Sequence, residues 1–539
     1  MPKSKDKRIY EVLGVFLLVL AAAVIRNTYL LQYEVRLPYY RIPILDAAYY
    51  DSWAVRVAQG KGYGPMPFYM APLYPYVLAL VYKVFQHNFT IVYFFQEMLG
   101  VLNVFLVYLL GRRLFGHAVG LIAGLIITLY APVVYLESKL LTETLAISLS
   151  LGSLLMLMRA IDRPTILRFL GTGLMLGLSA VCRPAALLTA VLMALWLLWR
   201  KPVKGRLVAV LAAGVALAIL PVTARNYFVG KDVALITTNG GICFAQANAS
   251  LATGVSSTIG GFTSSLATQQ QEEMELASRG VGHRVTASES AAFWFKFGLR
   301  MAKEHPGRFA LLQLKKLVWS LHNREPGCSY SAYFEQTLVP ALRWLFMPFS
   351  VLAGLGLFGF IRSRRNKEAE LLAIQVISVY VTMIVFAMSS RYRVPAMPIM
   401  AIFTGFGIVQ AVSKHQASSI AHYALRITGM LACLAAVSAV SLIKYPQPLI
   451  LPSDTGNLGT AYMDSGDLDK AIYYLDKTLK MEPSSFAHFN LANALFAKDR
   501  LDEAVLHYRK AVELRPDDRR FQAVLAQAGL KQERSQPHH

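Results

Sequence analysis

Charged residues are scarce in this chain, and their scarcity excludes an ordinary soluble protein. Only 16% of the 539 residues are charged, whereas 55% are hydrophobic, and a typical soluble domain carries about a quarter charged residues. The net charge of +22 would suggest a nucleic-acid partner in a soluble protein. Here much of it lies in short loops between long apolar runs, which is the positive-inside pattern of a protein that crosses a membrane many times.

The chain also lacks the common soluble-enzyme motifs. It contains no P-loop, no Rossmann glycine pattern and no HExxH sequence, so nucleotide-driven or zinc chemistry has no support. Its four cysteines form no CxxC pair and no metal spacing. Cys243 and Cys328 fall in one predicted loop, and a bridge between them is left open because pairing cannot be read from spacing.

The apolar runs predict an all-α, polytopic membrane protein with about 11 transmembrane helices. The basic first residues predict a cytoplasmic amino terminus, and an odd number of spans then places the carboxyl terminus outside. We expect a membrane domain over residues 1–445, with outer loops at 34–89 and 225–339. A linker at 446–452 and a separate helical domain at 453–532 follow.

The last part of the chain is polar and repetitive. Four residues of one unit recur about 33 positions later: Leu458, Gly459, Ala471 and Pro483 correspond to Leu491, Ala492, Ala504 and Pro516. The pattern resembles tetratricopeptide repeats, in which small residues let paired helices pack closely. Binding of a protein partner or acceptor is one role for such repeats, and a spacer that aids folding or dimerisation is an equal alternative.

Acids and arginines gather at the outer ends of the predicted spans. They are Asp46, Glu143, Arg183, Arg225, Arg391 and Arg393. Most have an ordinary explanation: Asp46 as a helix N-cap and Glu143 as a partner of Lys139. Arg183 would extend its charged end to the interface, and Arg391 and Arg393 would be interfacial anchors. Their convergence on one face predicts a common cavity, to which we add Tyr49, Tyr50, Asp51, Asn226 and Asn239.

These residues lie in motifs that resemble the GT-C membrane glycosyltransferases, closest to protein O-mannosyltransferases and lipid A aminoarabinose transferases (glycosyltransferase family 39-like). The motifs are ILDAAYYDSWA, SKLLTETL, CRPAALL, LPVTARNYFVG, TTNGGICFAQAN and RYRVPAMP. The resemblance covers about Tyr10 to Val412 and excludes the repeats.

The resemblance implies an enzyme of the cytoplasmic (inner) membrane that moves a sugar from a polyprenyl-phosphate donor to an acceptor hydroxyl at the outer face, with inversion. Asp46 would be the catalytic base, and Glu143 would share its cavity. The arginines would hold the lipid-linked phosphate, a task suited to guanidinium groups. A divalent cation at Asp46 and Glu143 is left open. A membrane-anchored repeat scaffold or a transporter is the alternative, although a transporter should show paired internal repeats.

Overall fold

The computed structural model describes residues 4–250, 252–255, 266–325, 331–345, 347–386, 388–413 and 420–535. Within these ranges the regular secondary structure is entirely helical, in agreement with the predicted fold class. Cys328 lies outside the described ranges, so its bridge to Cys243 stays an open prediction.

The chain divides into two compact units. The membrane unit comprises residues 1–30, 49–328 and 341–446, and the repeat unit comprises residues 31–48, 329–340 and 447–539. The segment with Asp46 therefore belongs to the repeat unit, which the sequence did not suggest. The predicted domain boundaries at residues 445 and 453 stay predictions.

Seven helices are long and apolar enough to cross a membrane in the described part of the chain. They are α1 (Ser4–Arg36), α4 (Phe89–Phe115), α7 (Glu143–Asp162), α10 (Gly205–Phe228), α17 (Lys367–Phe386), α19 (Met397–Val412) with the two short helices before it, and α20 (Ile420–Val440). Five shorter apolar helices are α3 (Leu73–Phe85), α5 (His117–Thr128), α8 (Ile166–Cys182), α9 (Ala186–Arg200) and α16 (Phe349–Ser363). Most of the predicted spans fall on one of these helices, which confirms a polytopic membrane protein. The aromatic run PFYMAPLYPYVLALVY, a pattern that suits a helix in the membrane interface, overlaps α3.

One predicted span is broken. The apolar run from Val119 to Leu136 predicts one helix, but α5 ends at Thr128 and a short helix, α6 (Ala131–Glu137), begins two residues after Leu129. Pro132 lies in the first turn of α6, where the missing N–H costs nothing, whereas inside a continuous helix it would remove a hydrogen bond. The break lets the chain turn before Glu143.

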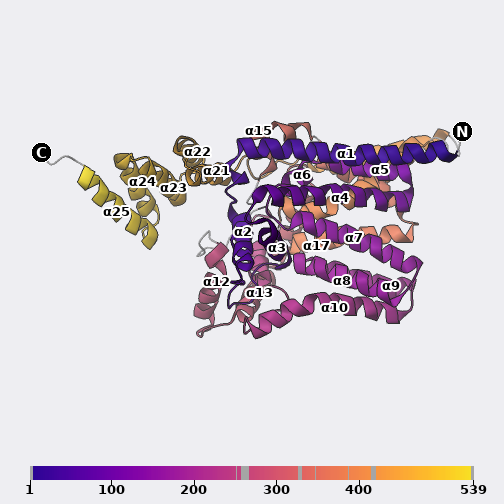
Figure 1. Cartoon of the computed structure of the whole chain (residues 1–539), viewed down its shortest axis with the longest axis horizontal. Coiled ribbons are helices and arrows are strands. Elements are labelled where there is room, and N and C mark those ends of the chain that lie inside the picture. The colour runs from indigo at the N-terminus through magenta and orange to yellow at the C-terminus, as the bar shows by residue number, and fades with distance from the viewer. Residues whose placement is uncertain are drawn as a thin grey trace. The chain divides into compact units, whose positions relative to one another are not determined.

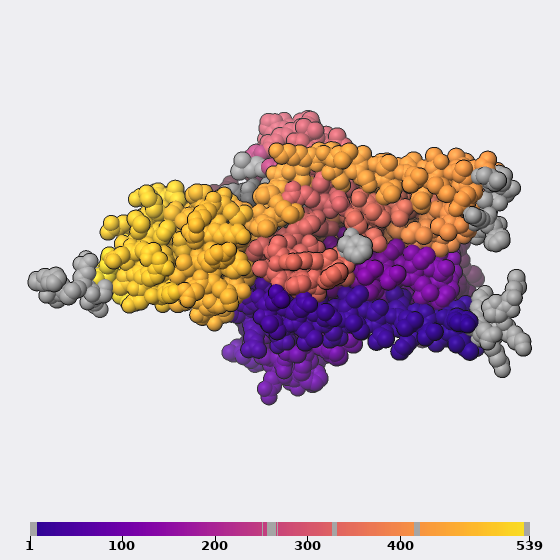
Figure 2. All heavy atoms as spheres, turned by 90° about the horizontal axis from the view of Figure 1, so that it is seen from above, coloured from indigo at the N-terminus to yellow at the C-terminus, as the bar shows by residue number. Residues whose placement is uncertain are grey.

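The membrane helices pack side by side, as α4, α7, α8 and α10 show in Figure 1. Between α8 and α10 the approach is close enough to require glycine. A Cβ on Gly173 would lie 2.1 Å from the carbonyl oxygen of Leu211. Helix α1 lies along the surface of the bundle (Figure 2), and its exposed residues are mainly apolar, as expected of a face in contact with lipid.

Smaller helices connect these spans. They are η1 (Pro38–Tyr40), α2 (Leu45–Ala58), α11 (Gly240–Asn248), α12 (Leu266–Val281), α13 (Ala287–Glu304), α14 (Pro306–Ser320), α15 (Ala332–Leu338), η2 (Pro340–Trp344), α18 (Ser390–Arg393) and η3 (Val394–Ala396). The run PGRFALLQLKKLVWSL predicts an interfacial helix, and α14 covers it from Pro306 to Ser320.

The carboxyl-terminal repeats form antiparallel helix pairs: α21 (Pro452–Asp464) with α22 (Leu468–Met481), α23 (Ser485–Ala497) with α24 (Leu501–Leu514), and a last helix α25 (Arg519–Ser535). A Cβ on Gly459 would lie 2.6 Å from the side chain of Leu475, so the recurrent small residue is where the paired helices touch. Pro483 and Pro516 follow the ends of α22 and α24. The prediction of tetratricopeptide repeats is confirmed.

Candidate functional site

Glu143 is the centre of a buried ion cluster in the membrane unit. Its Oε1 atom lies 3.1 Å from Nη1 of Arg183 and 2.8 Å from Nε of Arg391. The side chains of Glu143, Arg183 and Arg391 are 1%, 15% and 7% exposed. Three predicted site residues from distant parts of the sequence thus meet. The alternative pairing of Glu143 with Lys139 is not the one that forms: its carboxylate binds the two arginines.

Local sequence places each partner. Glu143 is the first residue of α7, so its acidic side chain also lies where the partial positive charge of a helix N-terminus favours it. Arg183 follows the end of α8 in an extended conformation with φ −145°, because the next residue, Pro184, disfavours helix at the position before it. The ring of Tyr392 lies 5.1 Å from the guanidinium of Arg183 and 5.6 Å from that of Arg391, a cation–π arrangement on both.

A cavity of about 500 Å³ adjoins this cluster. Arg183, Arg391 and Tyr392 form part of its wall, together with residues of α7, α8, α9, α11 and α17. The lining is mainly apolar with interspersed hydroxyl and amide groups, including Ser150, Ser179, Thr189, Asn239, Gln375, Ser378 and Thr382. Along α7 it extends from Thr142 to Ser150, about 12 Å of helix axis. Charge is therefore concentrated at one part of an otherwise neutral pocket.

Two more predicted cavity residues line this space. Tyr50 is 2% exposed and packs edge-on against Tyr74, with ring centroids 5.5 Å apart. Asn239 borders the cavity at the start of α11.

Tyr49 and Asp51 make other contacts. The Tyr49 hydroxyl lies 2.9 Å from that of Tyr63. Asp51 accepts a hydrogen bond of 2.6 Å from the Tyr82 hydroxyl and lies 2.8 Å from Nε2 of His87. Asp51 thus links α2 to the C-terminal end of α3. Neither Tyr49 nor Asp51 is part of the cavity wall.

The other two predicted arginines bind the protein's own backbone and acids. Arg225 donates to the carbonyl oxygens of Met66 and Gly64, and its guanidinium lies 4.4 Å from the ring centre of Phe68. Neighbouring Asn226 is fully buried, accepts from the N–H of Phe68 at 3.0 Å and donates to two further carbonyls. Both residues fix the loop between α2 and α3 and do not line the cavity.

Arg393 is fully buried and pairs with Glu325. It also donates to the carbonyl oxygens of Ser320 and His322, at 3.1 and 2.9 Å. These contacts tie the end of α14 and the residues after it to the short helices before α19. Although Arg391 and Arg393 are only two residues apart, Arg391 contacts Glu143 at the cavity wall and Arg393 contacts Glu325 away from it.

Asp46, the predicted base, lies in the first turn of α2 and is partly buried. It belongs to the repeat unit, whereas Glu143 belongs to the membrane unit. Its catalytic role stays a prediction.

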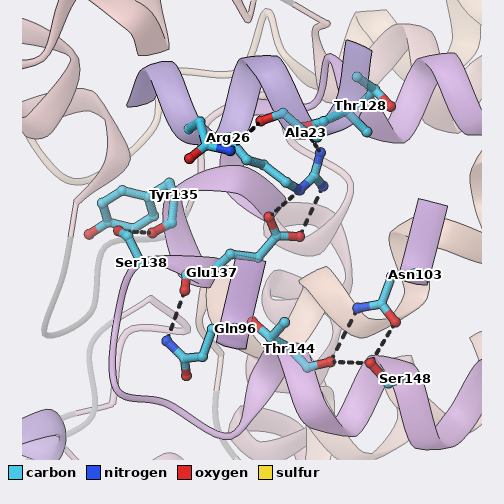
Figure 3. Close-up of polar contacts among 12 residues, drawn as sticks. Ala23, Arg26, Gln96, Asn103, Thr128, Tyr135, Glu137, Ser138, Thr144 and Ser148 are labelled. Atoms are coloured by element: carbon cyan, nitrogen blue, oxygen red, sulfur yellow. Dashed lines mark hydrogen bonds and ion pairs between the residues drawn. The ribbon is translucent and has the colours of Figure 1, made fainter. Parts of the chain in front are cut away.

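A second buried ion pair was not singled out from the sequence. Nε of Arg26 lies 2.7 Å from Oε2 of Glu137, and their side chains are 1% and 3% exposed. Figure 3 shows the pair beside Gln96, which contacts the backbone that leads to Glu143. Charged residues inside apolar segments indicate a functional or paired role, so Arg26 and Glu137 could each have been noted. Nothing in the sequence indicates that they contact each other.

The cluster does not fit a divalent cation at Glu143. Two guanidinium groups already contact Oε1, and their combined charge exceeds that of the carboxylate. No group of three or more His, Cys, Asp or Glu side chains with metal-binding geometry occurs in the described part of the chain. An excess of positive charge is instead suited to an anion, and phosphate matches the guanidinium geometry.

Fold and site together define a class: a polytopic, all-α membrane protein with an arginine-lined cavity and appended helical repeats. Residues 69–236 match the family model described as dolichyl-phosphate-mannose-protein mannosyltransferase, and residues 457–519 match the tetratricopeptide repeat model. The first match includes Glu143, Arg183 and Arg225. These matches confirm the resemblance to GT-C glycosyltransferases in the membrane unit and support a membrane glycosyltransferase.

Solved structures of the oligosaccharyltransferase from Archaeoglobus fulgidus show a weaker similarity. The complex with an inhibitory peptide and a dolichol-phosphate has a TM-score of 0.40 at 14% identity, covering 87% of this chain and 60% of the other. The apo form has a TM-score of 0.43 at 14% identity, covering 88% and 60%. This chain thus spans less than two thirds of that enzyme's length, and we take no residue correspondence from the similarity. A search of curated proteins gave no match.

Proposed function

We propose that this protein transfers a sugar from a polyprenyl-phosphate donor to an acceptor hydroxyl at the outer face of the cytoplasmic membrane. The observation that carries the proposal is the Glu143–Arg183–Arg391 cluster at the wall of the cavity. A lipid-linked phosphate needs positive charge beside an apolar space, and both are present. The basic loops between spans support an orientation with the amino terminus inside and the repeats outside.

The donor phosphate would bind Arg183 and Arg391. Guanidinium groups stay protonated and offer two parallel donors to phosphate oxygens. As the bond between the anomeric carbon and the phosphate oxygen breaks, that oxygen keeps the electron pair and gains negative charge. Two preorganised arginines stabilise this charge more in the transition state than in the bound donor, which is what lowers the barrier.

Asp46 would act as the base. The acceptor oxygen attacks the anomeric carbon from the side opposite the phosphate, and its proton passes to the Asp46 carboxylate, so the configuration inverts. Glu143 would not take this proton, because its carboxylate is held by two cations. Its role is to orient both guanidinium groups and to lower the net positive charge so that the lipid phosphate can leave.

Arg225 and Arg393 would be structural in this scheme, since their donors are engaged by the protein's own backbone and by Glu325. The repeats would bind a protein partner or acceptor. The first repeat helix, α21, packs against η1 in the segment between α1 and Asp46, so a partner on the repeats could influence the position of the base.

The test is genetic complementation followed by mass spectrometry. A strain that lacks the gene should lose one glycan species and accumulate a lipid-linked sugar, and the wild-type gene should reverse both changes. Asp46→Asn and Arg391→Gln should express normally and fail to reverse them, whereas Asp51→Asn is the matched acid control and should reverse them. Full complementation by Asp46→Asn would refute its role as base, and an unchanged glycan profile in the deletion strain would refute the proposal as a whole.

A further inference from the structure

The ion pair between Arg26 and Glu137 is enclosed by helices of the membrane unit. In addition to the 2.7 Å contact, Nη2 of Arg26 donates to Oε1 of Glu137 at 3.0 Å, which makes the pair bidentate (Figure 3). Burying two charges costs several kcal/mol per ion before their attraction is counted, so such a pair is weak evidence for stability alone. Its position suggests another purpose: Glu137 ends α6, six residues before Glu143.

The packing around the pair makes room for it specifically. A Cβ on Gly100 in α4 would lie 2.5 Å from the carboxyl carbon of Glu137 and 2.6 Å from both of its oxygens. Alanine is favoured over glycine inside a helix by about 1 kcal/mol. The glycine at this position is explained by the space that the carboxylate occupies.

Gln96, one turn earlier on α4, connects the same region to the backbone. Its Nε2 donates to the carbonyl oxygens of Glu137 and Lys139, each at 2.9 Å. Its Oε1 accepts a hydrogen bond of 2.6 Å from the hydroxyl of Tyr74, which fixes the orientation of the amide. The side chain thus binds two points of the turn between α6 and α7.

The other side of Glu143 is held in a similar way. The carbonyl oxygen of Thr144 accepts from Nδ2 of Asn103 at 3.2 Å. The hydroxyl of Ser148 lies 2.7 Å from Oδ1 of Asn103 and 3.1 Å from the same carbonyl oxygen, and its single proton serves one of these acceptors at a time. Figure 3 shows both groups of contacts on either side of the turn. Glu143 therefore sits between two fixed stretches of backbone.

We propose that Arg26, Glu137 and Gln96 are positioning residues for the phosphate site: they hold the turn before α7 so that the Glu143 carboxylate meets Arg183 and Arg391. This inference rests on the proposed function of that cluster. A displacement of about 1 Å at a catalytic group can cost about a hundredfold in rate. The desolvation cost of Arg26 and Glu137 is thereby explained: the pair fixes the geometry of the phosphate site, although neither residue contacts it.

The test compares two glycine substitutions in the full-length protein, reconstituted in lipid nanodiscs. Gly100→Ala places a methyl group against the Glu137 carboxylate. Gly152→Ala, in α7, is the matched control, because a Cβ there meets only the flexible end of Met175 at 3.9 Å. Equilibrium binding of a polyprenyl monophosphate and the thermal unfolding midpoint are measured for both.

Gly100→Ala should weaken polyprenyl monophosphate binding at least tenfold relative to Gly152→Ala, with an unfolding midpoint within a few degrees of the control. If Gly100→Ala does not fold, Gln96→Met tests the positioning role instead, because methionine keeps the side-chain length and removes the hydrogen bonds to the Glu137 and Lys139 carbonyls. Gln96→Met should weaken polyprenyl monophosphate binding about threefold or more. In complementation with the natural donor, overproducing the donor should restore only part of the activity, because misplaced arginines also stabilise the leaving phosphate less, so that kcat falls while KM rises.

Arg391→Gln distinguishes a failure of the positioning role from a failure of the phosphate site. If it weakens binding while Gly100→Ala and Gln96→Met bind as tightly as the Gly152→Ala control, the positioning role is refuted and the phosphate site stands. If Arg391→Gln also binds as tightly as wild type, the phosphate site itself is refuted, and the positioning role with it.

Discussion

Neutralising Glu143 and neutralising Arg391 should change donor affinity in opposite directions. The cluster contains two guanidinium groups and one carboxylate in direct contact, at 3.1 and 2.8 Å, so its net charge is +1. Arg391→Gln reduces that charge to zero, and Glu143→Gln raises it to +2. Any effect through misfolding would weaken binding in both variants, so the difference in sign isolates the electrostatic contribution.

The magnitude follows from the contacts. One hydrogen bond to a charged group contributes about 1.5–3 kcal/mol net, and each 1.4 kcal/mol is about tenfold in affinity. Arg391→Gln should therefore weaken polyprenyl monophosphate binding about 10–100-fold. Glu143→Gln should tighten it by up to about tenfold, because both arginines lose a competing negative charge while the amide oxygen can still accept their hydrogen bonds and keep them oriented. Transfer should nevertheless be slowed by Glu143→Gln, since the arginines then hold the leaving phosphate too strongly.

The assay is equilibrium binding in nanodiscs at low ionic strength, repeated at high salt. The two effects should shrink only modestly with salt, because both groups are buried and screened less than surface charges. Weaker binding in both variants would refute the charge argument. Equal binding in all three proteins would show that the phosphate does not bind at this cluster.

Three further outcomes follow from the structure. Transfer activity in purified membranes should survive dialysis against EDTA, because the Glu143 carboxylate is occupied by two arginines; loss of activity restored by a divalent cation would contradict this. Arg225→Met should lower the unfolding midpoint, since the Gly64 and Met66 carbonyls lose their donor, yet leave phosphate affinity of the folded protein within about twofold. Burial raises the pKa of Glu273, which accepts a hydrogen bond from the Tyr69 hydroxyl, to about 7 from 4.5. Above pH 7 the ionised carboxylate therefore destabilises the folded state by up to about 3 kcal/mol, a cost that is absent below pH 4.5. Glu273→Gln should raise the unfolding midpoint at pH 8, and an equal gain at pH 4.5 would show another cause.

Much of the architecture could be predicted from the sequence because hydropathy reports it directly. Most predicted spans fall on an apolar helix, and the spacing of Gly459 and Ala492 revealed the repeats because close helix contact demands small residues. The split between α5 and α6 was missed, although Pro132 was visible, since a proline within an apolar run is also tolerated inside membrane helices.

The site was predicted in part. Glu143, Arg183 and Arg391 meet as the topology suggested, because each lies at the same end of its span. Arg225 and Arg393 occupy equivalent positions in the sequence, yet their side chains bind backbone carbonyls and Glu325. Whether such an arginine reaches the cavity or binds the protein's own groups depends on the direction of its side chain over a few ångströms. Neither the order of the spans nor the distribution of charge predicts that direction. The Arg26–Glu137 pair depends on a contact across 111 positions of sequence, for which one sequence gives no signal.

The most direct test of the central claim is an experimental structure of the protein in a lipid nanodisc with a polyprenyl monophosphate bound. We predict phosphate density within hydrogen-bonding distance of both Arg183 and Arg391, with the first isoprene units in the adjoining cavity. Phosphate density at Arg225 or Arg393, with the cavity filled by bulk lipid, would contradict the account.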